Sequence, residues 1–125
     1  MNIATGLEYS GGMEDMFRSV LEIFCTLKDE NKAKIQNAFE QRNWKNYTIF
    51  VHSLKSTSLS VGGEKCSALA KELEKAGNVL KNSNSSESDK HKAEEYIKSH
   101  HAEVMELYEE LVEENKRYLN EGTSL

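Results

Sequence analysis

Residues 47–63 read YTIFVHSLKSTSLSVGG, and the pattern of this stretch decides the fold. Its core-type residues recur at alternating spacings of four and three, which places them on one narrow face of a helix. The Gly62-Gly63 pair then ends the helix, because glycine readily adopts the positive φ of a helix terminus. The stretch therefore predicts one helix of a bundle, buried along a single stripe that comprises Tyr47, Val51, Leu54, Ser58 and Val61.

The rest of the chain shows the same helical periodicity and no strand-like alternation. None of the 125 residues is a proline, which favours long uninterrupted helices. The polar interruption at Lys28–Asn31 is interpreted as either a kink or a break with Asp29 as N-cap. We expect a single all-α domain over residues 1–125, an up-and-down antiparallel four-helix bundle with a short leading helix. The expected helices are 5–10, capped by Thr5, then roughly 13–27, 29–41, 44–61 after an Asn43 cap, 66–80, and 86–120.

Composition excludes several classes of function. The net charge is −5, so the chain lacks the basic patch that a nucleic-acid binder needs. Lysines alternate with glutamates, which leaves no basic stripe for a membrane surface, and no apolar run approaches the ~20 residues of a membrane span. The start of the chain does not resemble a secretory signal. We therefore expect a cytoplasmic protein in which Cys25 and Cys66 are reduced, buried thiols.

His52 is the residue whose surroundings suggest chemistry. It follows Val51 by about 100° around the helix, so it should lie at the edge of the buried stripe and point to solvent. Lys55 and Ser56 lie one turn further on, and Ile49 lies one turn back. A neutral imidazole is a good nucleophile near pH 7, a lysine can offset charge on phosphoryl oxygens, and a small residue allows a partner to approach closely. This set of residues indicates phosphoryl transfer.

The sequence around His52 resembles the histidine-containing phosphotransfer (HPt) domain. The family pattern has a histidine, then Leu-Lys-Gly, a serine, a glycine, and a helix that ends in Leu-Glu. The matching residues here are His52, Leu54, Lys55, Ser58, Gly62, Leu69, Leu73 and Glu74. Gly6-Leu7, Gly11-Gly12, Leu21–Phe24 and Asn43-Trp44 also match, so the resemblance covers roughly residues 3–80. Ser56 stands where the family has glycine, and Gly63 where alanine is common.

The resemblance implies a phosphorelay intermediate, not an enzyme with its own ATP site. His52 would accept a phosphoryl group from a receiver-domain aspartate, or from a kinase, and pass it to another receiver domain. Lys55 would support the phosphate charge. The receiver would supply the divalent cation, so this chain needs no cofactor and no metal. We expect a monomer that docks its partners on Ile49, Ser56, Leu59, Gly62 and Gly63, either as a free protein or as a segment of a larger sensor kinase.

Other interpretations remain open at this stage. A helical protein–protein interaction module without phosphotransfer is the main alternative, because residues 87–119 carry a glutamate-rich face that could dock a basic partner. A zinc site on His91, His100 and His101 is disfavoured, because adjacent residues on a helix point about 100° apart. A Cys25–Cys66 site lacks a C-x-x-C signature. No nucleotide-binding fingerprint or catalytic set supports an independent enzyme.

Overall fold

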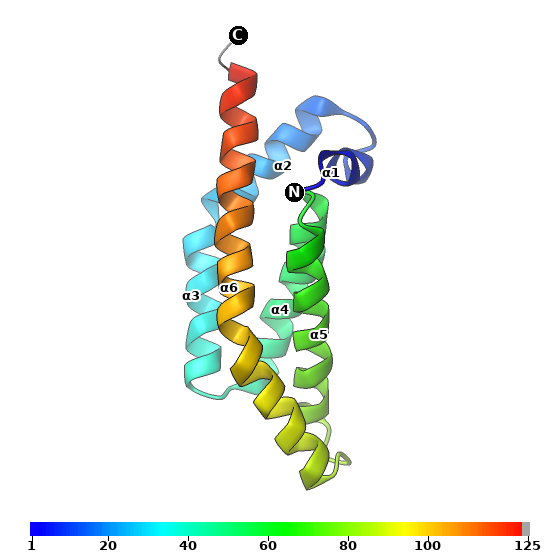
Figure 1. Ribbon diagram of the computed structural model, residues 1–125, viewed down its shortest axis with the longest axis vertical. Helices are drawn as coiled ribbons and strands as arrows, with labels where there is room; N and C mark the ends of the chain where they lie inside the picture. The colour runs from blue at the N-terminus through cyan, green and yellow to red at the C-terminus, as the bar shows by residue number, and fades with distance from the viewer. Residues whose placement is uncertain (124–125) are drawn as a thin grey trace.

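The computed structural model of the chain describes residues 1–123, which form six helices and no strand (Figure 1). This confirms the expected all-α class. The sequence-predicted helices are all present, with ends that differ by a few residues at most. The helices are α1 (Ile3–Tyr9), α2 (Glu14–Thr26), α3 (Lys28–Glu40), α4 (Trp44–Ser60), α5 (Glu64–Lys81) and α6 (Glu87–Thr123).

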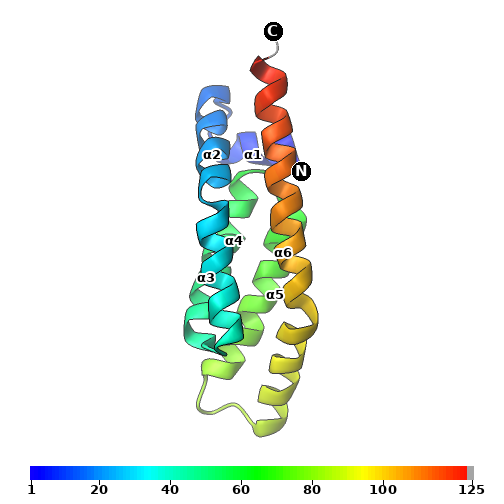
Figure 2. The same cartoon turned by 90° about the vertical axis from the view of Figure 1, so that its left-hand side faces the viewer.

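The long helices lie alongside one another and enclose a common core. Helices α3, α4, α5 and α6 run in alternating directions, whereas α1 and α2 lie at the end of the molecule where α4 finishes and α5 begins (Figures 1 and 2). The α4–α5 and α5–α6 pairs have the most extensive contacts. None of the helices within residues 1–123 is both long and apolar enough to cross a membrane.

The junction between α2 and α3 is a kink in a nearly continuous helix. Leu27 keeps a right-handed helical conformation, its N–H donates to the Ile23 carbonyl, and its own carbonyl accepts from the Asn31 N–H. Asp29 therefore lies inside α3, where it pairs with Lys28, and the alternative in which it caps a separate helix was wrong.

Side-chain caps begin three of the helices. The Asn43 and Ser86 side chains accept from backbone N–H groups three residues later, which confirms the predicted starts of α4 and α6. The leading helix begins earlier than predicted. Asn2, not Thr5, is its cap, and the Asn2 carboxamide oxygen accepts from the Thr5 N–H at 3.1 Å.

The buried stripe predicted for residues 47–61 is confirmed. Tyr47, Val51, Leu54, Ser58 and Val61 are all buried, and the Ser58 hydroxyl donates to the Leu54 carbonyl at 2.6 Å. The helix ends as predicted at Gly62, which has a φ of +83°. With this stripe inside, the neighbouring positions on α4 must lie at the surface, and this geometry exposes His52.

His101 is a core residue of α6. Its ring is 5% exposed and stacks on Phe39 with 3.9 Å between centroids. The Tyr47 hydroxyl donates to Nδ1 at 3.1 Å, and Nε2–H donates to the Gln36 side-chain oxygen at 2.8 Å. Burial lowers the pKa of His101 from 6.5 to about 4, against a smaller opposing effect of Glu40, so the ring is neutral.

This buried ring makes the fold sensitive to acid. Because the folded-state pKa lies below the unfolded value, the unfolded chain binds more protons between pH 6.5 and 4. The stabilisation is therefore complete above about pH 6.5 and falls by roughly 3 kcal/mol as the pH approaches 4. Chemical denaturation of wild type and His101→Gln at pH 7 and pH 4.5 measures this effect. Carboxylates such as Glu74 titrate in both proteins, so an equal acid loss in the two would contradict the assignment to His101.

Candidate functional site

Helix α4 presents His52 on its outer face. The ring is 60% exposed, while the buried stripe on the opposite side anchors the helix to the core. Ser56 is also exposed, Leu59 is half-buried, and Ile49 is 51% exposed, although large aliphatic side chains usually lie inside. The structure thus places His52 among a small residue and two accessible aliphatic residues, as the spacing predicted.

Glu74 of α5 joins His52 and Lys55 through one carboxylate. Its Oε2 atom forms a short contact with His52 Nδ1, and its Oε1 atom accepts from Lys55 Nζ at 2.7 Å. The carboxylate is only 15% exposed, so it approaches the ring from the protein side and leaves the outer edge of the ring accessible. The three side chains form a chain of hydrogen bonds across the α4–α5 interface.

The charge of Glu74 determines where the protons lie in this set of hydrogen bonds. Burial alone would raise its pKa, but the hydrogen bonds from Lys55 and His52 outweigh burial, and the pKa lies below its usual value. The carboxylate is therefore ionised near neutral pH and can only accept hydrogen bonds. In the neutral form of the His52 ring, Nδ1 must then carry the proton, which leaves the lone pair on Nε2.

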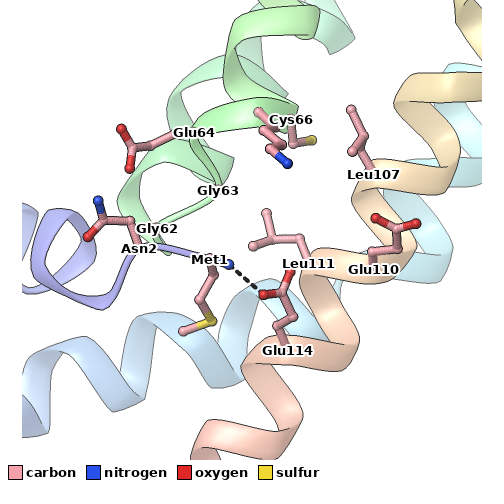
Figure 3. Close-up of a pocket in the computed structure, with 11 residues that line it drawn as sticks. Met1, Asn2, Gly62, Gly63, Glu64, Cys66, Leu107, Glu110, Leu111 and Glu114 are labelled. Carbon is pink, nitrogen blue, oxygen red and sulfur yellow. Dashed lines mark hydrogen bonds and ion pairs between the residues drawn. The ribbon is translucent and has the colours of Figure 1, made fainter.

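The residues proposed for docking do not all lie at the surface. Gly62 and Gly63 are buried, because Gly62 lies against the Asn2 backbone and Gly63 against the Leu111 side chain. Figure 3 shows both glycines beside a pocket at the start of α5, with the Met1 amino group paired with Glu114. Both glycines therefore shape the turn that ends α4, and their contact with a partner stays a prediction.

Periodicity alone missed the role of Glu74. In the family pattern, Glu74 is only one of the matching positions. A signal was present in its spacing, since Ser67, Ala70, Glu74 and Gly77 recur at three and four residues along one helical face. A carboxylate on an otherwise small, inward face needs a partner, and His52 and Lys55 are that partner.

The other histidines and the cysteines do not form a second site. His91 is exposed, His100 stacks on Tyr96, and His101 belongs to the core. Within residues 1–123, no cluster of three His, Cys, Asp or Glu side chains could hold a metal ion. Both cysteines are free thiols, and burial raises the pKa of Cys66 to about 12, which makes it unreactive.

Comparison with known families agrees with this geometry. A family model described as the Hpt domain matches residues 19–114, a segment that contains His52, Lys55 and Glu74 and most of the chain. Searches of curated proteins and of solved structures found no match. The family consists of phosphocarrier modules of two-component relays that have no ATP site of their own. The fold, the exposed histidine and the extent of this match together establish that the chain belongs to the Hpt domain family.

Proposed function

We propose that this chain is a phosphorelay intermediate that accepts a phosphoryl group on His52 from a receiver-domain aspartate, or from a sensor kinase, and passes it to another receiver domain. The observation that carries the proposal is the exposed His52 ring, anchored through Nδ1 by the Glu74 carboxylate. We infer that the chain acts as a single monomeric domain. In this view α2 and α3 form one bent arm of an up-and-down four-helix bundle, which holds α4 rigid while a partner docks.

The transfer step follows from the ring's protonation state. Nε2 attacks phosphorus, a bond forms between Nε2 and phosphorus, and the bond between phosphorus and the aspartate oxygen breaks. The product ring keeps its proton on Nδ1 and carries a positive charge. The Glu74 carboxylate stabilises that charge, so its effect is larger after attack than before it. Return transfer to a second receiver reverses these bond changes.

The proposal is tested by incubating the protein with phosphorylated receiver domains and following the label. Label that moves to this chain should be lost in acid and retained in alkali, as expected for an N–P bond. If no receiver or kinase donates label to a folded protein, phosphotransfer is wrong, and the chain is better described as a helical interaction module.

Loss of the Glu74 carboxylate should slow transfer without unfolding the protein. Glu74→Ala removes both the anchor on Nδ1 and the charge that stabilises the phosphorylated ring, so we expect a rate roughly tenfold lower. Glu72→Ala is the matched control, because Glu72 lies on the same helix, is exposed and pairs only with Lys75 in the described structure. Rapid-quench phosphotransfer measures both; equal rates for the two variants would remove Glu74 from the mechanism.

Replacement of Lys55 should also slow transfer, by a smaller factor. Lys55 lies one turn from His52, and its ammonium group donates a hydrogen bond to Glu74. Lys55→Ala therefore removes a cation from the phosphoryl site and leaves the carboxylate in place. A partly exposed cation contributes modestly in water, so we expect a decrease of roughly threefold at low salt. The difference from wild type should shrink as salt rises. Lys98→Ala on α6 is the control, and wild-type rates for Lys55→Ala at low ionic strength would contradict the electrostatic role.

A further inference from the structure

Helices α4 and α5 approach very closely one turn away from the His52–Glu74 contact. Gly77 follows Glu74 by three residues, and Thr48 precedes His52 by four, so the two pairs occupy adjacent layers of one antiparallel interface. A Cβ atom added at Gly77 would lie 2.1 Å from Thr48 Oγ1 and 3.1 Å from Thr48 Cβ. At the present separation of the helices, only glycine fits at position 77.

Thr48 cannot easily move away from such a Cβ atom. It is 3% exposed, its hydroxyl donates to the Trp44 carbonyl at 2.6 Å, and its branched side chain has few rotamers in a helix. A methyl group at position 77 would therefore displace α5 and would not simply turn the Thr48 side chain.

A second contact holds the two helices together on the other side of Glu74. The Ser67 hydroxyl of α5 donates to the Lys55 carbonyl of α4 at 2.7 Å. Glu74 thus lies between two positions at which a small residue of α5 packs directly on α4: Gly77 against Thr48, and Ser67 against Lys55. The donor and acceptor atoms of an N–H···O hydrogen bond usually lie within about 3.2 Å of each other, so the reach of Glu74 to the ring depends on this spacing.

We propose that Gly77 is a positioning residue for the phosphoacceptor: by allowing α5 to lie directly against Thr48, it brings Glu74 within hydrogen-bonding reach of His52 Nδ1. The inference rests on the proposed function for its effect on transfer. Its structural part, the state of the His52 ring, stands independently of phosphorylation. Gly77 does not touch the reacting atoms, and it acts only through Glu74.

The test compares Gly77→Ala with the double variant Thr48→Ala/Gly77→Ala. In the double variant, the contacts of the new Cβ atom with the Thr48 hydroxyl and methyl groups are gone, and the remaining 3.1 Å approach to the Cβ atom of residue 48 needs a shift of only a few tenths of an ångström. The first readout is the ¹⁵N NMR signals of the His52 ring in unphosphorylated protein, which report the tautomer and the bond at Nδ1. The second readout is the rate of transfer from a phosphorylated receiver.

We expect Gly77→Ala to shift the His52 ring signals away from the Nδ1-protonated form and to slow transfer roughly tenfold. The double variant should restore the wild-type ring signals and the wild-type rate of transfer. The melting temperature of Gly77→Ala should also fall. Alanine is the better helix former, but the free-energy cost of displacing α5 outweighs that gain in helix propensity. Thr48→Ala alone provides the baseline for the double variant.

Wild-type ring signals in a folded Gly77→Ala protein would overturn the proposal. If Gly77→Ala does not fold, the double variant decides: native His52 signals support the close approach, whereas an unfolded protein or altered signals reject it. Absence of label transfer to wild type would instead reject the proposed function, and the ring signals would still decide the role of Gly77.

Discussion

Replacement of His52 by glutamine should abolish phosphate acceptance and leave the fold intact. The variant removes the imidazole nitrogen that would accept the phosphoryl group, and glutamine cannot form a stable N–P bond. The ring is 60% exposed and takes no part in the core, so its loss should change stability by no more than about 0.5 kcal/mol apart from the bond to Glu74. Label transfer from a phosphorylated receiver, together with a thermal melt, measures both effects.

His91→Gln is the matched control for this experiment. His91 is also an exposed histidine on a helix, but it lies on α6 and has no carboxylate anchor among the contacts described for residues 1–123. The His91→Gln protein should accept label at the wild-type rate. Acid-labile label that persists on a folded His52→Gln protein would mean that another residue is the acceptor, and the remaining histidines would then be replaced in turn.

The parts of this site that a helical period determines could be predicted from the sequence. Tyr47, Val51 and Leu54 fix which face of α4 is buried, and the exposure of His52 then follows from its angle to that face. Lys55 and Ser56 follow in the same way, because residues three and four apart share a surface. The ends of α4 were also predictable, from the Asn43 cap and the positive φ of Gly62.

The contacts between helices could not be predicted in this way. Periodicity says that Glu74 lies on a particular face of α5, but not that this face meets His52, since that depends on how closely and in which register α5 packs on α4. The burial of Gly62 is a similar case: it arises from the Asn2 backbone, sixty residues away in sequence, whose N–H donates to the Gly62 carbonyl at 2.7 Å. From the pattern of α4 alone, that glycine was expected at the surface.

Of the residues predicted to dock a partner, Ile49 and Ser56 lie exposed on the outer face of α4. Ile49, together with Phe50 and Ser53, lines a recess between α3 and α4, on the side of His52 away from Glu74. Leu59 is half-buried further along α4. Direct transfer requires the partner's phosphoryl group to reach Nε2, so the partner backbone must rest on the residues one turn either side of the ring.

Ser56→Trp should for this reason block transfer without unfolding the protein. An indole at this exposed position projects beside His52 and fills the space that a partner backbone needs, so we expect a decrease in transfer of roughly a hundredfold. Ser56→Gly should transfer at least as well as wild type, because it opens the same space further. Ala102→Trp adds the same bulk to an exposed site on α6 and should have no effect. Receiver binding and phosphotransfer, with melting curves for all three variants, provide the measurement; normal transfer by a folded Ser56→Trp protein would show that the partner reaches His52 from another side.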